Sequence, residues 1–276
     1  MNFRQQTTGI VSVIAMLASF GLNAAKATAE TFDFSITYDT VFDFNFESLE
    51  VTQPGVEIPE SIDITPLIDN LPEEYRAVLP EDFSPIIDNP SIIDVFGSGV
   101  STEPDVPFGF TNFTTDTYGL PITLESVPDP ETGEPLPVRQ LIIFRADPND
   151  FSLNLPSPEF SDVYSGENTD NKLFGLANDQ AILNIISPTE GTVAGGGIIT
   201  LVGGEGTFEG AVGQISFNQS DTFNPSDDGP TLGQATLEFS IETPQEVPEP
   251  GTPATLLGLG VIGSGVLLRR RNKKQF

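Results

Sequence analysis

Residues 32–46 alternate between apolar and polar side chains along almost their whole length. The apolar residues occupy even-numbered positions, interrupted only by Thr40: Phe32, Phe34, Ile36, Tyr38, Phe42, Phe44 and Phe46. Because successive side chains of a β-strand point to opposite faces, this pattern predicts a strand with one buried face and does not fit a helix. At about 3.3 Å per residue the run is longer than most strands, so we expect a bend or bulge near Asp39 and Thr40.

Residues 51–157 are rich in proline, with 16 prolines between Pro54 and Pro156. Proline has no N–H to donate to a sheet, so we expect mainly loops, edge strands and short turns in this region. A short helix is predicted to start at Pro72 and to stop at Pro80, with two similar turns at residues 65–70 and 84–89 on either side of it. The apolar run at residues 141–144 predicts a buried strand.

From residue 172 onward, apolar runs alternate with glycine-rich turns. We expect strands at residues 181–186, 192–202 and 235–241, with another beginning at residues 214–217, and turns at residues 188–191 and 203–206. Short antiparallel strands joined by such turns predict a mainly β body, either an antiparallel β-sandwich or a barrel-like sheet.

The segment at residues 203–213 reads GGEGTFEGAVG. It resembles the GGTGxFxxAxG turn of dirigent-like and allene-oxide-cyclase-like β-barrels, and departs from it at Glu205. The resemblance implies a barrel-like arrangement and transfers no enzymatic role. A phosphate-binding loop is excluded because no lysine follows the glycines.

The chain carries 40 acidic and 11 basic residues, and it contains no His, Cys or Trp. It therefore lacks the residues of a Ser-His-Asp triad, a Cys-His dyad, a His- or Cys-rich zinc site and a haem held by His or Cys. The net charge of −29 is opposite to that of a nucleic-acid binder. All acidic residues lie between Glu30 and Glu249, where only four basic residues oppose them and the net charge is −36.

Residues 1–29 predict a secretory signal peptide. Arg4 supplies a positive charge, an apolar run follows at residues 9–22, and the small residues Ala27 and Ala29 form a cleavage site before Glu30. The alternative is an uncleaved membrane anchor, but the apolar run is shorter than the roughly 20 residues that a spanning helix needs. The acidic body is expected to extend over residues 30–246.

The C-terminal end, residues 247–276, combines three features in order. It begins with Val247, Pro248, Glu249 and Pro250 and continues with an uncharged run at residues 254–268. A helix of that run would be about 22 Å long, short for a bilayer core of about 30 Å. The basic residues that follow could reach the headgroups and should stay cytoplasmic: Arg269, Arg270, Arg271, Lys273 and Lys274.

This arrangement resembles the PEP-CTERM sorting signal of exported proteins in Gram-negative bacteria and cyanobacteria. The resemblance implies passage through the secretion machinery, a membrane-spanning helix at residues 254–268, and recognition by an exosortase. It also implies a final location in the cell envelope or outside the cell, often together with exopolysaccharide and biofilm production. Residues 111–119 and 219–221 make the body similar to cyanobacterial PEP-CTERM proteins, a likeness that carries no activity with it.

We assign no catalytic, cofactor-binding or metal-ligating residue from the sequence. Calcium is the one ion to consider, because oxygen ligands are plentiful at residues 147–150, 162–170 and 227–229, although none of these segments has EF-hand spacing. The leading interpretation is a non-enzymatic exported protein of the envelope or extracellular matrix, with no nucleic-acid partner. The alternatives are a calcium- or carbohydrate-binding adhesive module and a carboxylate-based glycan hydrolase.

Overall fold

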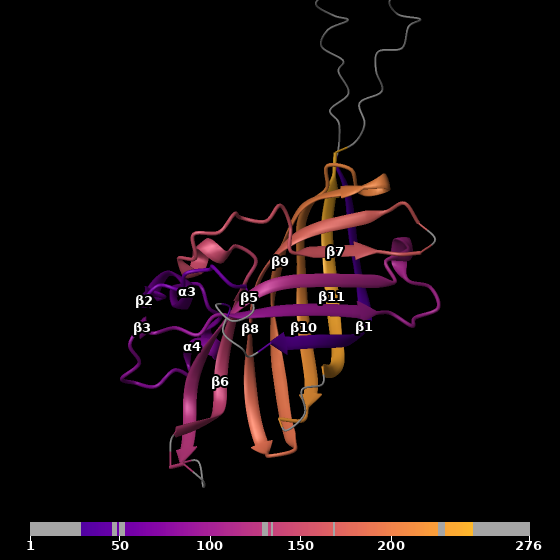
Figure 1. The fold of residues 1–276 in the computed structure, drawn as a ribbon. Coiled ribbons are helices and arrows are strands. Elements are labelled where there is room, and N and C mark those ends of the chain that lie inside the picture. Colours follow the sequence, from indigo (N-terminus) through magenta and orange to yellow (C-terminus); the bar gives the residue numbers. More distant parts are fainter. Residues whose placement is uncertain are drawn as a thin grey trace, which may run out of the picture. The chain divides into compact units, whose positions relative to one another are not determined.

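The computed structural model describes residues 29–45, 49, 53–128, 132–133, 135–167, 169–225 and 230–244. Within these residues the main element is one antiparallel sheet of nine strands (Figure 1). In chain order they are β1 (Glu30–Asn45), β4 (Ile93–Val100), β5 (Asn112–Pro128), β6 (Pro135–Arg145), β7 (Asp162–Ser165), β8 (Lys172–Ser187), β9 (Glu190–Glu205), β10 (Val212–Phe223) and β11 (Thr231–Thr243). This confirms the mainly β antiparallel body.

Short elements connect and cover these strands. β2 (Ser61–Asp63) and β3 (Ile86–Asp88) form a separate two-stranded sheet. The helices are α3 (Thr65–Asp69) and α4 (Glu73–Arg76), with single 3₁₀ turns at η1 (Pro107–Gly109), η2 (Pro148–Phe151) and η3 (Gly206–Phe208). Residues 30–243 belong to one compact unit.

The nine-stranded sheet closes on itself. Its strands neighbour one another in the order β4-β1-β11-β10-β9-β8-β6-β5-β7, and β4 also pairs with β5, where Ile93 lies opposite Gly119 and Val100 opposite Asn112. β6 and β7 both lie between β5 and β8. β7 pairs with the first part of β5 and of β8, and β6 pairs with the later part of the same two strands. The strands thus enclose an interior.

β1 confirms the strand predicted from the alternating pattern. Ile36 and Tyr38 are buried, and Thr40 shares their face, where its hydroxyl donates to Asp221 Oδ1 at 3.0 Å. Of the expected bend or bulge near Thr40, the bulge is wrong, because β1 pairs with β11 and then with β4 in unbroken register. The strand is long because two partners share it: residues 30–42 pair with β11 and residues 39–45 with β4.

Glycines lie directly opposite phenylalanines in three cross-strand pairs. A Cβ atom added to any of these glycines would overlap the ring of its partner. A ring that covers the glycine opposite it buries apolar surface and fixes the register of the two strands. The pairs are Phe42 with Gly97, Phe113 with Gly99, and Phe223 with Gly191.

Apolar residues pack on both faces of part of the sheet. One cluster lies inside the closed sheet and includes Ile36, Tyr38 and Leu237. The second covers the opposite face of β5 and β6, where Leu120 and Leu141 pack with residues of the segment that contains β2 and α3. Figure 1 shows β2, β3, α3 and α4 gathered beside β6. The middle of β5 and the second half of β6 are therefore buried on both faces.

The prediction for the proline-rich region is wrong in its main point. Residues 51–157 contain β4, β5 and β6, which are long and paired on both sides over much of their length. Many of the prolines precede β4 or lie near the ends of strands. Pro121 lies within β5, but only beyond the point where pairing with β4 stops at Gly119, so one edge of the strand is free there.

Of the predictions for single helices, turns and strands, some are confirmed and others are wrong. The short helix after Pro72 is confirmed, although α4 ends at Arg76. The two similar turns are wrong, because residues 65–69 form α3 while residues 86–88 form β3. Asp63 Oδ1 accepts hydrogen bonds from the N–H and the hydroxyl of Thr65 at 2.9 and 2.6 Å, a local contact that favours the turn into α3. The strands at 141–144 and after residue 172 are confirmed, with longer bounds.

Phenylalanines pack against one another near the start of β1. Their ring centroids are 4.6 to 6.4 Å apart, as is typical of aromatic clusters. Three of the rings lie outside the strands: Phe108 in η1, Phe110 directly after it, and Phe208 in η3. The members are Phe32, Phe34, Phe108, Phe110, Phe208 and Phe239.

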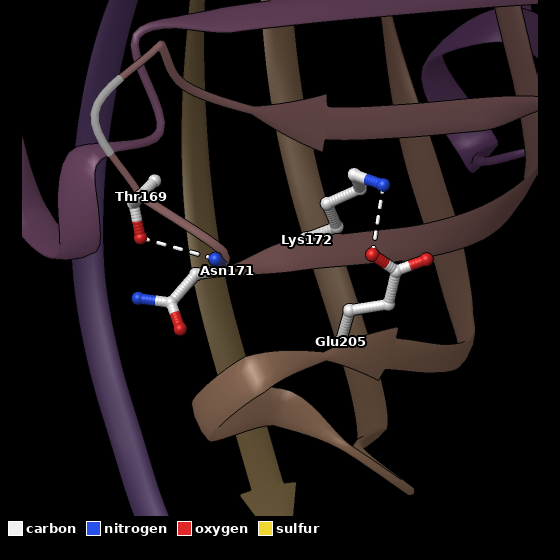
Figure 2. Close-up of polar contacts among 4 residues, drawn as sticks. All are labelled: Thr169, Asn171, Lys172 and Glu205. Carbon is white, nitrogen blue, oxygen red and sulfur yellow. Dashed lines mark hydrogen bonds and ion pairs between the residues drawn. The ribbon is translucent and has the colours of Figure 1, made fainter.

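Asn171 ties η1 to η3. Its Nδ2 donates to the carbonyl of Phe108 at 3.3 Å, and its Oδ1 accepts the N–H of Thr207 at 3.0 Å. Its own N–H donates to Thr169 Oγ1 at 3.0 Å (Figure 2). The next residue, Lys172, forms an ion pair with Glu205 across β8 and β9, with 2.7 Å between Nζ and Oε2 (Figure 2).

Asn171 and Lys172 provide a matched pair of substitutions. We expect Asn171→Ala to lower the free energy of unfolding by about 1–2 kcal/mol, because two hydrogen bonds that hold separate turns are lost. Lys172→Ala should cost less than about 1 kcal/mol, because both partners of its ion pair are exposed to solvent. Urea unfolding of the full-length protein measures both changes; an equal loss in the two variants would contradict this role of Asn171.

The closure of the sheet predicts an effect at Gly99. Gly99→Val should lower the free energy of unfolding by about 1–3 kcal/mol, because the new side chain would displace the ring of Phe113. Gly203→Ala is the control, since no atom lies within 4 Å of a Cβ placed there. Thermal unfolding followed by circular dichroism compares the two variants. An unchanged midpoint for Gly99→Val would show that the packing of the Phe113 ring does not depend on a glycine at position 99.

Candidate functional site

Most residues of the two predicted targeting segments lie outside the described residues. This holds for Ala27, for the predicted helix at residues 254–268, for the motif Val247, Pro248, Glu249 and Pro250, and for the basic residues Arg269, Arg270, Arg271, Lys273 and Lys274. Ala29 and Glu30 are described and exposed. Glu30 is the first residue of β1 and pairs with Thr243 of β11. A chain cut after Ala29 would therefore keep β1 whole.

The described residues of the segments considered for calcium are not brought together as a metal site. Asp147 uses Oδ1 to accept the backbone and side-chain N–H groups of Asn149, and Oδ2 to accept the hydroxyl of Ser157, so its oxygens stabilise a turn. Asp162 is buried in the interior of the sheet. Residues 227–229 lie outside the described part of the chain. Where the structure is described, no group of three or more His, Cys, Asp or Glu side chains could hold a metal ion.

A small cavity lies inside the closed sheet. Its volume is about 40 Å³, enough for about three water molecules at 10–15 Å³ each. Small residues on β8 and β9 bring these two strands close together beside it: a Cβ at Gly195 would lie 2.6 Å from that of Ala181, and a Cβ at Gly197 would lie 2.5 Å from that of Asp179. Polar residues in its lining include Thr115, Thr117, Asp162, Tyr164, Asp179 and Gln219.

Asp162 places a carboxyl group in this interior from β7. Its residue surface is 3% exposed, and its Oδ2 accepts the hydroxyl of Ser161. Ser161 Oγ in turn accepts the N–H of Ala177 on β8 at 2.9 Å. Burial raises the pKa of Asp162 to about 7, although hydrogen bonds from Ser161 and Thr115 and the nearby hydroxyl of Tyr164 lower it in part. Asp162 therefore keeps its proton to a much higher pH than an exposed aspartate does.

Asp179 places a second carboxyl group in the same cavity from β8. Its Oδ1 is shielded from solvent and has no hydrogen-bond partner. Burial, followed by the negative charge of Asp162, raises the pKa of Asp179 to about 8, while Arg145 opposes the shift. The Arg145 guanidinium donates instead to two backbone carbonyls, that of Phe144 at 2.6 Å and that of Asp179 at 3.3 Å. The carboxyl group itself thus has no direct cationic partner among these contacts.

Tyr164 adds a hydroxyl group to the two carboxyl groups. It is fully buried, and its Oη faces Asp162 without forming a hydrogen bond of ordinary geometry. Burial and then the charge of Asp162 raise its pKa well above the usual value. Tyr38 provides the contrast, because its hydroxyl donates to the carbonyl of Phe110 at 2.7 Å. The cavity thus holds proton-binding oxygens, two of them without a partner.

No sequence motif singles out Asp179 or Tyr164, and Asp162 stands out only as part of a segment rich in oxygen ligands for calcium. A usable signal was present in residues 177–181, where Asp179 occupies the same register as the buried Ala177 and Ala181. A carboxylate at one of the alternate positions whose side chains point to the buried face must itself be buried or must distort the strand. The space around it depends on Gly195 and Gly197 of the neighbouring strand, which local patterns do not place.

A short Pro-Glu-Pro sequence, an uncharged run and a basic end characterise a protein that is sorted after export. Residues 246–271 match the PEP-CTERM protein-sorting motif, which confirms the resemblance seen in the sequence. No curated protein and no solved structure matches the chain. The motif implies export, recognition by an exosortase, and location in the cell envelope or outside the cell.

The expected membrane anchor falls within this motif. The helix predicted at residues 254–268 lies outside the described residues. Among the residues that the structure does describe, no helix is long and apolar enough to cross a membrane.

The buried carboxyl groups predict an unusual dependence of stability on pH. In the unfolded chain an aspartate has a pKa of about 3.9, so the folded protein binds more protons than the unfolded chain between about pH 4 and pH 8. The stability that these groups contribute is fully present below pH 4 and is lost as the pH rises through 7 and 8.

Asp179→Asn isolates this contribution. We expect the difference in free energy of unfolding, variant minus wild type, to increase by up to about 1.4 kcal/mol per pH unit as the pH rises from 5 to 8. Urea unfolding at half-unit pH steps measures the difference. Glu238→Gln, which removes an exposed carboxylate, is the control. A difference between Asp179→Asn and the wild type that does not change with pH would contradict the assignment.

Proposed function

We propose that this chain is a non-enzymatic protein of the bacterial cell envelope or extracellular matrix, held in the membrane by residues 254–268 before processing. The observation that carries the proposal is the PEP-CTERM motif at residues 246–271, placed after a body of strong negative charge. In this account the secretion machinery removes residues 1–29, and an exosortase then processes the tail. The closed sheet is the part that is delivered.

The charge of the body supports a role beside exopolysaccharide. Residues 30–249 carry a net charge of −36, and many of the acidic side chains on the strands point outward, among them Asp33, Asp39, Glu238 and Glu242. Such a surface stays hydrated and is repelled by anionic polymers at low ionic strength. Divalent cations would reverse this repulsion by bridging the two, which fits association with a matrix in a medium that contains calcium.

The interior cavity supports the non-enzymatic proposal over a glycan hydrolase. Hydrolysis of a glycosidic bond needs two carboxyl groups on opposite sides of a bound sugar chain. The cavity does contain two carboxyl groups, Asp162 and Asp179, but its volume of about 40 Å³ accommodates about three water molecules and not a sugar ring. The pair therefore has no room for a glycan substrate.

An adhesive module that binds calcium or carbohydrate is the alternative. The observation in its favour is a pair of stacked rings, Phe160 and Phe174, whose centroids are 4.8 Å apart and of which Phe160 is 39% exposed. An aromatic ring at the surface can pack against the apolar face of a sugar. A rise in the melting temperature with Ca²⁺ or with secreted polysaccharide would support this alternative, and unchanged melting would dismiss it.

Deletion of residues 247–276 tests the sorting function. We expect the truncated protein to leave the membrane and envelope fractions and to accumulate in the medium, because the exosortase no longer recognises it. Fractionation followed by immunoblotting measures the distribution. Replacement of Pro248, Glu249 and Pro250 by alanine should leave an unprocessed protein in the membrane, while Lys172→Ala serves as the control. Retention of the truncated protein in the envelope would show that the tail is not the address.

A further inference from the structure

The cavity inside the sheet contains two buried oxygen atoms that no protein group satisfies, Asp179 Oδ1 and Tyr164 Oη. A buried polar atom without a hydrogen bond costs about 1–3 kcal/mol. The carboxyl group of Asp162 lies beside Tyr164 and lines the same space. A ligand that formed hydrogen bonds with these atoms would remove this free-energy cost from the folded protein.

The polar atoms of the cavity call for a ligand that donates hydrogen bonds. The side chains of Thr115 and Thr117 add further hydroxyl oxygens. The two amide side chains in the lining already donate to other groups: Gln180 Nε2 to the carbonyl of Gly196 at 2.6 Å, and Gln219 Nε2 to Asp221 Oδ2. Hydrogen-bond acceptors therefore predominate over free N–H donors.

The charges of the cavity call for a cation. Two carboxyl groups share a space in which the nearest guanidinium, that of Arg145, is engaged with backbone carbonyls. In the part of the chain that the structure describes, the one ion pair joins Lys172 to Glu205 at the surface. The strong negative charge of the body also raises the concentration of cations around the protein.

The remaining lining favours an organic cation over a metal ion. Calcium requires six to eight oxygen ligands, and no cluster of three acidic side chains is present among the described residues. Much of the wall is hydrocarbon, including the rings of Phe42, Phe113 and Phe144. Aromatic rings attract cations and also accommodate carbon atoms. The volume of about 40 Å³ limits the ligand to about three non-hydrogen atoms.

We propose that the cavity inside the closed sheet binds a small primary ammonium ion. Its three N–H groups would donate to Asp162, Asp179 and Tyr164, and its one or two carbon atoms would lie against the phenylalanine rings. This proposal is independent of the sorting function, because it concerns residues of the body alone.

The acid–base properties of the cavity couple binding to pH. The ionisable groups that interact with the two carboxyl groups are Tyr164 on β7, Tyr75 on α4 and Arg145 on β6. Tyr38 on β1 interacts in turn with Tyr164, and Asp150 in η2 with Arg145. At pH 6 the empty cavity holds protons on Asp162 and Asp179, which an ammonium ion must displace. An alkyl ammonium stays charged to about pH 10, like lysine. Affinity should therefore increase by about tenfold or more between pH 6 and pH 9.

Nuclear magnetic resonance with ¹³C-methylammonium as the probe tests the proposal on the full-length protein. We expect saturable binding with an upfield shift of the methyl resonance, because the methyl group would lie among aromatic rings. Asp179→Asn and Tyr164→Phe should each weaken binding at least tenfold at pH 8. Glu238→Gln, which removes an exposed carboxylate, should bind as the wild type does, and the melting temperature of each variant shows that it is folded.

Two results would overturn the proposal. An unsaturable shift of equal size in the wild type and in Asp179→Asn would show that methylammonium only accumulates near the acidic surface. Displacement of methylammonium by Ca²⁺ at equal or lower concentration, with sodium at matched ionic strength as the reference, would identify a metal site instead. Weaker binding in Tyr164→Phe, which loses one oxygen atom and keeps its ring, would distinguish the hydroxyl contact from a general effect on packing.

Discussion

The pairing of β4 with both β1 and β5 is the contact on which the rest of the structure depends. It turns an open sheet into a closed one, and β4 makes it possible by presenting Gly97 and Gly99 to the rings of Phe42 and Phe113. Side chains at these glycines would hold the rings away and would open the seam. The two rings then line the interior cavity, so the contact that closes the sheet also shapes the space inside it.

The interior of the closed sheet has one part filled by aromatic rings and another that contains polar groups. Phenylalanines fill the part near the start of β1, where Asn171 holds η1 and η3 together. Beyond them lie the carboxyl groups of Asp162 and Asp179, whose removal from water is costly. The ring of Tyr164 belongs to the apolar core, and its hydroxyl is buried there without a hydrogen-bond partner. A fold optimised for stability alone would have apolar residues there. The combination of a stable shell and costly polar groups is typical of a site that binds a ligand.

Much of the fold follows from local sequence patterns. The alternating residues of β1 and the glycine-punctuated strands after residue 172 are visible because one face of each strand is apolar and the other polar. β5 and β6 were not foreseen in full, because the segment before β4 covers their outer face and removes the alternation. Closure itself could not be read from the sequence, since it depends on pairing between distant residues and on which phenylalanine meets which glycine.

The sorting tail and the interior cavity also differ in how far local sequence predicts them. The sorting tail is a contiguous motif, so sequence alone identifies it. The cavity gathers Asp162 from β7, Asp179 from β8 and Thr115 from β5, and only the fold brings them together. The central claim is that the delivered body holds two carboxyl groups in its interior without a direct cationic partner. Titration of ¹³C-labelled aspartate side chains by nuclear magnetic resonance tests it directly: the account predicts two resonances with midpoints near pH 7 and pH 8, and it would be contradicted if every aspartate titrated near pH 4.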